Sequence, residues 1–286
     1  MSPNGSSGPA SQALQHAILQ TLKYSDHFDF PLTISELSLR LIGTKSSISQ
    51  LKLTLGQLLA DKAIFKSGDY YYYLPRHQSI VKHRLLAQDV SLKQLKKAQT
   101  IATKLGKIPG VKAIYLTGSL AMLNSSPNSD IDFMVITESH KLWTTRFLLT
   151  IYTSLIGRRR TPSTLFSRDK LCLNLYLSES SYQLPKSKQS LYSAYELVQA
   201  KPLVDPSNTR SELLAANPWI KTYLPQAISQ SVIPPSSKTL QKGQKTGLLE
   251  VILFQLQYLY MKRKITREYI TQDSAFFHPN NPAPKL

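Results

Sequence analysis

Two short apolar runs with a polar segment between them constrain the fold of this chain more than any other feature. Residues 111–137 read VKAIYLTGSLAMLNSSPNSDIDFMVIT, with apolar runs at 114–116 and 133–136. Both runs are rich in β-branched or aromatic residues and are bounded by turn-forming residues, which is typical of buried strands. The segment therefore predicts two strands of a hydrophobic sheet joined by a polar connection.

Two aspartates lead into the second of these runs. Because strand side chains alternate, Asp130 and Asp132 are predicted on one face, and Ile131 and Phe133 on the other. Carboxylates about 7 Å apart along a strand repel each other, so a buried or half-buried pair needs a cation. Oxygen ligands favour Mg²⁺, which also takes phosphate oxygens, so we expect Mg²⁺ with Mn²⁺ as the alternative.

The turn after the first run has the residues of an anion cradle. Gly118 lets the backbone approach a ligand closely, and Ser119 is expected at a helix N-terminus, where N–H groups face an anion. A metal beside a phosphate cradle is typical of phosphoryl or nucleotidyl transfer. The alternative is a surface hairpin with a solvated acidic turn, which is less favoured because the chain has only 17 acidic residues against 35 basic ones.

Gly118 and Ser119, ten intervening residues, then Asp130-Ile131-Asp132 and an apolar strand resemble the signature of the DNA polymerase β-type nucleotidyltransferase superfamily. The resemblance covers about residues 100–180. It implies an α+β fold with a mixed β-sheet core. It also implies metal-dependent transfer of a nucleoside monophosphate from a nucleoside triphosphate, expected to be ATP, to a hydroxyl acceptor.

The third acidic position of the superfamily is not acidic in this chain. The resemblance implies a third carboxylate from a following strand, and the apolar run 171–177 carries Asn174 at the matching position. Alternation predicts Cys172, Asn174 and Tyr176 on one face of that strand. An amide oxygen can ligate Mg²⁺ but cannot act as a general base, so reduced or absent catalysis is the alternative. Asp169 and Glu179 flank the strand as possible substitutes.

The expected site residues follow from the resemblance and from local charge. They are the catalytic residues Asp130, Asp132 and Asn174, the metal ligands Asp130 and Asp132, and the nucleotide-binding residues Gly118, Ser119, Ser129 and Lys170. Local charge alone adds Arg158, Arg159 and Arg168 as candidates for neutralising phosphate.

The N-terminal part resembles a winged helix-turn-helix. Helical spacing, caps and turns predict helices over about 12–24, 33–41 and 47–60, followed by a hairpin over 63–74. In such modules the third helix enters the DNA major groove, which makes Lys45, Gln50 and Lys52 the candidate DNA-binding residues. The alternative is a module that serves only in packing or protein interaction.

The expected organisation has five parts. They are a disordered leader at 1–10, a winged-helix-like domain at 11–75, linker helices at 76–108, the transferase-like core at 109–182 and a helical C-terminal region at 183–286. The formal charge of +18 attracts nucleic acid, nucleotides or anionic surfaces. The single cysteine, Cys172, excludes an internal disulfide and fits a reducing compartment. We expect a cytoplasmic protein without a signal peptide or membrane span.

Two other functions remain open from the sequence. The first is a DNA-binding regulator whose transferase-like domain only senses nucleotide. The second is a toxin-neutralising transferase that modifies a protein hydroxyl, a hypothesis that rests on superfamily analogy alone.

Overall fold

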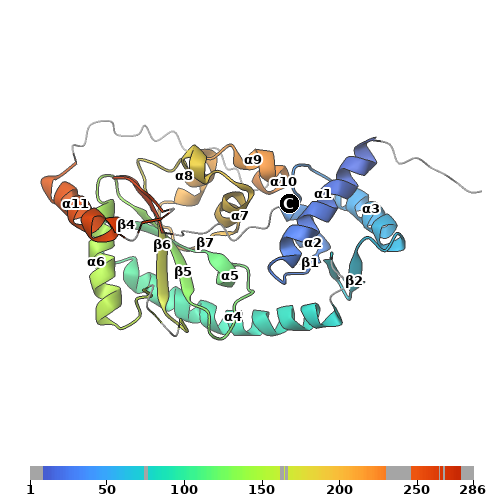
Figure 1. The fold of residues 1–286 in the computed structure, drawn as a ribbon, viewed down its shortest axis with the longest axis horizontal. Helices are drawn as coiled ribbons and strands as arrows, with labels where there is room; N and C mark the ends of the chain where they lie inside the picture. Colours follow the sequence, from blue (N-terminus) through green and yellow to red (C-terminus); the bar gives the residue numbers. More distant parts are fainter. Residues whose placement is uncertain are drawn as a thin grey trace, which may run out of the picture.

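Two β-sheets organise the chain. The computed structural model describes residues 9–73, 77–161, 164, 167–229, 246–263, 265–266 and 268–277. A three-stranded sheet with the order β1-β3-β2 lies in the N-terminal module, and a six-stranded sheet with the order β7-β4-β5-β6-β9-β8 forms the core (Figure 1). The larger sheet contains parallel and antiparallel pairs, so the predicted combination of a mixed sheet with helices is confirmed.

The N-terminal module is built around capped helices. Thr33 and Glu36 form the predicted capping box, and Ser47 and Gln50 form a second one. The elements are α1 (Pro9–Asp26), β1 (Leu32–Thr33), α2 (Ile34–Arg40), α3 (Ile48–Ala60), β2 (Phe65–Ser67) and β3 (Tyr70–Tyr72). Their apolar side chains form a hydrophobic core of their own. The winged-helix assignment and DNA binding both stay predictions.

The segment with the two apolar runs forms the centre of the larger sheet. β4 and β5 pair antiparallel, whereas β5 and β6 pair in parallel and are connected through α6. The elements are α4 (His77–Leu105), β4 (Val111–Leu116), α5 (Gly118–Ala121), β5 (Ile131–Thr137), α6 (Leu142–Leu155) and β6 (Leu171–Ser178). The predicted linker is thus the single long helix α4.

The C-terminal region contributes strands as well as helices, so the expectation of a purely helical region is wrong in part. β7 pairs with β4, and β9 pairs with β6. The elements are η1 (Lys186–Lys188), α7 (Leu191–Gln199), β7 (Lys201–Val204), α8 (Thr209–Ala215), α9 (Ile220–Tyr223), α10 (Pro225–Ser229), α11 (Leu248–Lys262), β8 (Tyr269–Ile270) and β9 (Ser274–Phe276). Residues 201–206 are expected from the sequence as an extended connection, and 201–204 form β7, an edge strand in which Pro202 is tolerated. A mobile loop is expected over the Pro/Ser/Lys-rich residues 229–245, which, except for Ser229, lie outside the described residues.

Helices cover both faces of the large sheet. Ile114 and Leu116 of β4 pack with apolar residues of α4, α6 and α11. Ala113 and Tyr115 point the other way and pack with α7, α8 and α9. Within the described ranges, no helix is both long and apolar enough to cross a membrane.

A β-bulge in β6 changes which residues share a face. Phe133 pairs with Leu173, but the next residue, Met134, pairs with Leu175, so Asn174 is an extra residue in β6. A bulge reverses the alternation beyond it. Tyr176 therefore packs on the α4, α6 and α11 face, and the prediction that it shares a face with Cys172 and Asn174 is wrong.

A buried glutamate from α11 caps the start of α6. No side chain at the N-cap position, Lys141, caps this helix. The carboxylate of Glu250 instead accepts hydrogen bonds from Trp143 N (2.6 Å), Thr144 N (2.8 Å) and Thr144 Oγ1 (2.7 Å). This contact joins α11 to the helix that connects β5 with β6.

We predict that Glu250→Ala destabilises the protein by about 2–4 kcal/mol, because it leaves buried donors without partners and removes a capping charge. The Glu250→Gln variant should lose less free energy of unfolding than Glu250→Ala. Chemical denaturation measures the difference. Glu138→Ala is the matched control, since Glu138 makes an exposed ion pair with Lys141, and its loss should cost less than about 0.5 kcal/mol. Equal effects of the two alanine variants would contradict the capping role.

Candidate active site

The candidate site lies where the end of β4 meets the starts of β5 and β6. Thr117 N donates to Asp132 O (3.0 Å), which places the following residue beside the aspartate. Gly118 has φ +64°, and a Cβ built on it would lie 2.5 Å from Asp132 Oδ2. Both the left-handed backbone and the close approach therefore require glycine.

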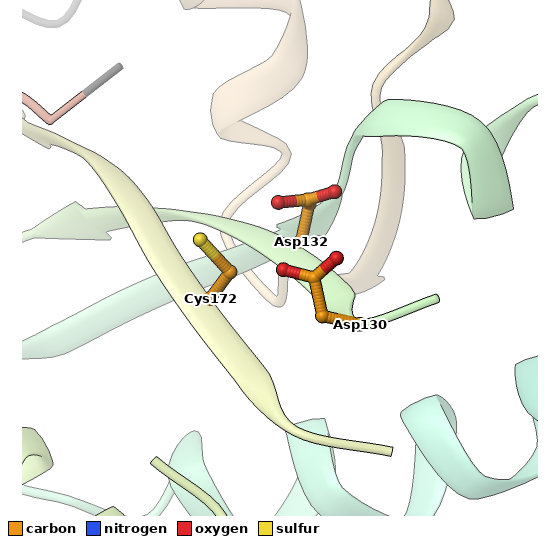
Figure 2. Close-up of side chains that lie close together, drawn as sticks. All are labelled: Asp130, Asp132 and Cys172. Atoms are coloured by element: carbon orange, nitrogen blue, oxygen red, sulfur yellow. The ribbon is translucent and has the colours of Figure 1, made fainter. Parts of the chain in front are cut away.

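Three potential ligand side chains converge at this edge. Asp132 and Cys172 are register partners on the parallel strands β5 and β6, and Asp130 directly precedes β5. Figure 2 shows the three side chains gathered on one side of the strands. One ligand atom from each lies within 4.8 Å of the others. The structure thus brings the two predicted aspartates together next to the Gly118 bend, and it adds Cys172, which sequence reasoning had placed on this face without a role.

Asn174 lies at the site but presents its donor to it. Its Nδ2 donates to Asp132 Oδ1 at 2.8 Å, and its side chain is buried. The expected contact of the amide oxygen with a metal stays a prediction. In this arrangement Asn174 orients the Asp132 carboxylate, and any catalytic role for it stays a prediction.

A single arginine of the 158–160 run reaches the aspartates. Arg160 forms an ion pair with Asp130, with 43% of the arginine side chain exposed. The backbone of Arg159 forms an isolated parallel β-bridge with Leu171 at the start of β6. Arg158 Nη1 donates to Asp169 O (3.2 Å). Local charge suggested Arg158, Arg159 and Arg168, but it could not separate neighbours within a basic run.

Burial and like charge perturb the carboxyl groups of the site. Burial, and secondarily the charge of Asp130, raises the pKa of Asp132 to about 7, although Cys172, Arg160 and Asn174 favour its ionised form. Burial and the two aspartates raise the pKa of the Cys172 thiol to about 12. The local cations and donors thus leave negative charge uncompensated, which a divalent cation would neutralise.

A third carboxylate, missed by sequence reasoning, reaches the site from α7. Glu196 accepts a hydrogen bond from the Gly118 N–H, and burial together with the charge of Asp132 raises its pKa to about 7. It lies 64 residues beyond Asp132 in the chain, so no local spacing links them. The one feature of the sequence that could have pointed to Glu196 is that it is the sole acidic residue of α7, LYSAYELVQ.

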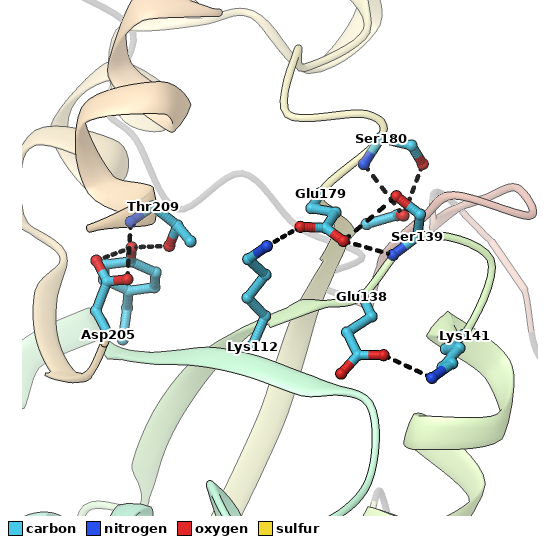
Figure 3. Close-up of polar contacts among 10 residues, drawn as sticks. Lys112, Glu138, Ser139, Lys141, Glu179, Ser180, Asp205 and Thr209 are labelled. Carbon is cyan, nitrogen blue, oxygen red and sulfur yellow. Dashed lines mark hydrogen bonds and ion pairs between the residues drawn. The ribbon is translucent and has the colours of Figure 1, made fainter. Parts of the chain in front are cut away.

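The two acidic residues proposed to replace the third carboxylate are engaged elsewhere. Glu179 pairs with Lys112 and accepts from Ser139 N (3.1 Å) at the far end of β6, as Figure 3 shows. Asp169 pairs with Lys97 on α4 at 2.7 Å. Neither therefore completes the cluster.

The contacts of the remaining candidates do not bear directly on their predicted roles. Ser129 Oγ bonds with Ser126 N (3.1 Å) inside the connecting turn, and Lys170 Nζ donates to Gly157 O (2.7 Å). Lys45 and Lys52 are exposed, whereas Gln50 Oε1 accepts from Ser47 N (3.0 Å) in the α3 cap. Their roles in nucleotide and DNA binding stay predictions.

We predict that metal affinity falls as the pH is lowered through about 7, because a proton competes with the ion at Asp132. Well below that pKa, the affinity for Mn²⁺ should approach a tenfold loss per pH unit. Titration calorimetry between about pH 5.5 and 8 measures it. The Asp132→Asn variant should bind Mn²⁺ weakly at every pH. A metal affinity of the native protein that does not depend on pH would contradict the assignment of Asp132 as a ligand.

Comparison with known proteins points in the same direction. No curated protein matches the chain. Residues 95–165 match the family model described as a nucleotidyltransferase domain. The match includes Gly118, Ser119, Asp130 and Asp132, whereas Cys172, Asn174 and Glu196 lie beyond it. The segment that carries the bend and both aspartates is thus similar to the nucleotidyltransferase domain family.

Proposed function

We propose that this protein is a divalent-metal-dependent nucleotidyltransferase that moves a nucleoside monophosphate from a nucleoside triphosphate to a hydroxyl acceptor. One observation carries the proposal: the two aspartates meet the Gly118–Ser119 bend within the segment that matches nucleotidyltransferases. ATP is the expected nucleotide.

The residues present fit a divalent ion. Asp130 and Asp132 offer carboxylate oxygens, and the raised pKa of Asp132 indicates charge that the protein alone does not balance. Both aspartates would hold Mg²⁺ or Mn²⁺. A bound ion would neutralise charge on the transferred phosphoryl group.

The remaining residues would position the nucleotide. Gly118 and Ser119 would hold the β- and γ-phosphates, so phosphate binding would displace Glu196 from the Gly118 N–H. Arg160 is half-exposed beside Asp130 and would neutralise phosphate charge. Asn174 would keep the Asp132 carboxylate in a fixed orientation.

Glu196 would accept the proton in the transfer step. The acceptor hydroxyl oxygen forms a bond to the α-phosphorus, the bond between that phosphorus and the bridging oxygen breaks, and pyrophosphate leaves with the electron pair. The hydroxyl proton passes to the Glu196 carboxylate. A pKa of about 7 suits this role, because a general base works best when its pKa lies near the operating pH. The carboxylate missing from β6 would thus come from α7.

A second candidate function is a nucleotide-sensing DNA-binding regulator. It is favoured by the amide at position 174 and by the exposed Lys45 and Lys52 on the N-terminal module. Duplex binding with a steep salt dependence and no turnover would support it, because phosphate contacts release counterions.

We predict that the protein transfers label from an α-labelled nucleoside triphosphate when Mg²⁺ or Mn²⁺ is present. Candidate acceptors are RNA, a protein hydroxyl and small hydroxyl compounds. Asp130→Asn and Asp132→Asn should each lower the rate by at least about a hundredfold, because each removes a charged metal ligand. Asp69→Asn in the exposed β2–β3 turn is the matched control and should keep full activity. Equal rates in all four proteins would reject the mechanism.

We further predict that, with the metal ion saturating at every pH, Glu196→Gln lowers the turnover number by about 10²- to 10⁴-fold and removes the rise of rate with pH near 7. Nucleotide affinity should change less than the turnover number, since the proton is accepted in the transfer step. The pH–rate profile of the native protein and the variant measures this. A variant that keeps both the rate and the rise with pH would exclude Glu196 as the base.

A further inference from the structure

A cavity of about 260 Å³ adjoins the Gly118–Ser119 bend. Segments from three parts of the chain line it: the connection between α1 and β1 together with Arg40, the bend itself, and α7. Glu196 and Gly118 belong both to this cavity and to the candidate active site. The cavity is therefore continuous with the place where phosphate is expected.

The N-terminal module is fixed against the core at this cavity. The rings of Tyr24 on α1 and Tyr195 on α7 stack with their centroids 4.5 Å apart. Tyr195 Oη donates to Arg40 O (2.7 Å), and Asn124 Nδ2 donates to Phe28 O (3.0 Å). These contacts connect the two units across the cavity lining, so the module forms one wall of the cavity.

Arg40 brings a positive charge to the wall of the cavity. Its side chain is 16% exposed, and its guanidinium lies over the Phe30 ring with 5.0 Å between Cζ and the ring centroid. Nη1 has no hydrogen-bond partner among the described residues, and its ion pair with Glu36 is 4.0 Å long. Nη1 is itself fully buried, so what Arg40 offers to the cavity is the positive charge of a mostly buried guanidinium, which favours a ligand that presents an acceptor atom.

The other walls suit a flat aromatic ligand. Phe28, Phe30 and Tyr192 supply rings, and a few polar groups such as Glu196 stand among them. Nucleobases stack on such rings and carry carbonyl or ring-nitrogen acceptors at their edges. The volume lies below the roughly 300–1,000 Å³ of sites for drug-sized ligands, so it fits one ring system rather than a whole nucleotide.

We propose that this cavity binds the base of the nucleoside triphosphate, and that the N-terminal module is thereby part of the nucleotide site. The proposal rests on the proposed function, because the phosphates over Gly118 and Ser119 bring the base to the cavity. It gives the module a role in substrate binding that does not depend on DNA.

The test compares two ligands in the full-length protein with Mg²⁺. One is a nucleoside triphosphate whose α,β-bridging oxygen is replaced by a methylene group, which prevents transfer, and the other is inorganic tripolyphosphate, which lacks a base. Titration calorimetry gives the dissociation constants for the native protein and for Arg40→Met, Tyr192→Leu and Tyr192→Phe. Lys82→Met on α4 is the control, since this exposed cation does not line the cavity.

We expect Arg40→Met and Tyr192→Leu each to weaken the nucleotide analogue by about 5- to 150-fold, the range found for loss of one base-stacking contact. Tripolyphosphate should bind all variants within about twofold of the native protein, because it makes no base contact. Tyr192→Phe keeps the ring and should bind the analogue nearly as well as the native protein. Two different cavity positions are tested, so a folding defect in one, detected by thermal unfolding, leaves the other decisive.

Four results would overturn the proposal. Unchanged analogue binding in the cavity variants would show that the base lies elsewhere, while label transfer would still support the proposed function. Equal weakening of the binding of both ligands would show that Arg40 contacts phosphate. A raised KM for the acceptor alone, measured in the label-transfer assay, would show that the cavity binds the acceptor. If neither ligand binds the native protein, the proposed function fails as well, and the absence of label transfer would confirm that separate failure.

Discussion

Repulsion between two carboxylates at the start of a buried strand sets the conditions for the rest of the site. Asp130 and Asp132 stand where β5 enters the hydrophobic sheet, and the neighbouring residues of the strand are fully buried. Arg160, Asn174 and Cys172 each interact with one of the aspartates, yet the pKa of Asp132 is still raised to about 7 by burial and by Asp130. The site thus carries negative charge that its own side chains do not neutralise.

The composition of this edge of the sheet explains why an acidic residue of α7 lies at the site. β6 runs parallel to β5, but it presents a thiol and an amide to the aspartates. Asp132 shares its face with Met134 and Ile136, which pack against α7, and Glu196 approaches from that helix. The helix layer on this face therefore brings to the site what the strand lacks. Asn174 donates to Asp132 from β6 and holds that carboxylate in place.

Local patterns predicted much of this arrangement. Turn residues, β-branched runs and caps gave the strands β4 and β5, the capping box at Thr33 and the meeting of Gly118 with Asp132. They worked because each depends on residues close together in the chain. Cys172 and Glu196 were missed because their roles depend on strand pairing and helix packing over 40 to 64 residues. The reversed orientation of Tyr176 was missed because a bulge leaves the alternation of apolar residues unchanged in the sequence. β7 was missed because edge strands tolerate residues that central strands exclude.

The stack of Tyr24 on Tyr195 has a consequence for how such a chain can be rearranged. Recombination often exchanges whole domains at linkers, and α4 looks like a natural point of exchange because it connects the two sheets (Figure 1). The six-stranded core grafted onto a foreign N-terminal module would lose the ring partner of Tyr195 and the carbonyl that its hydroxyl contacts. The packing of each half thus depends on the other, and a chain in which one half was replaced would need compensating changes at positions 24 and 195.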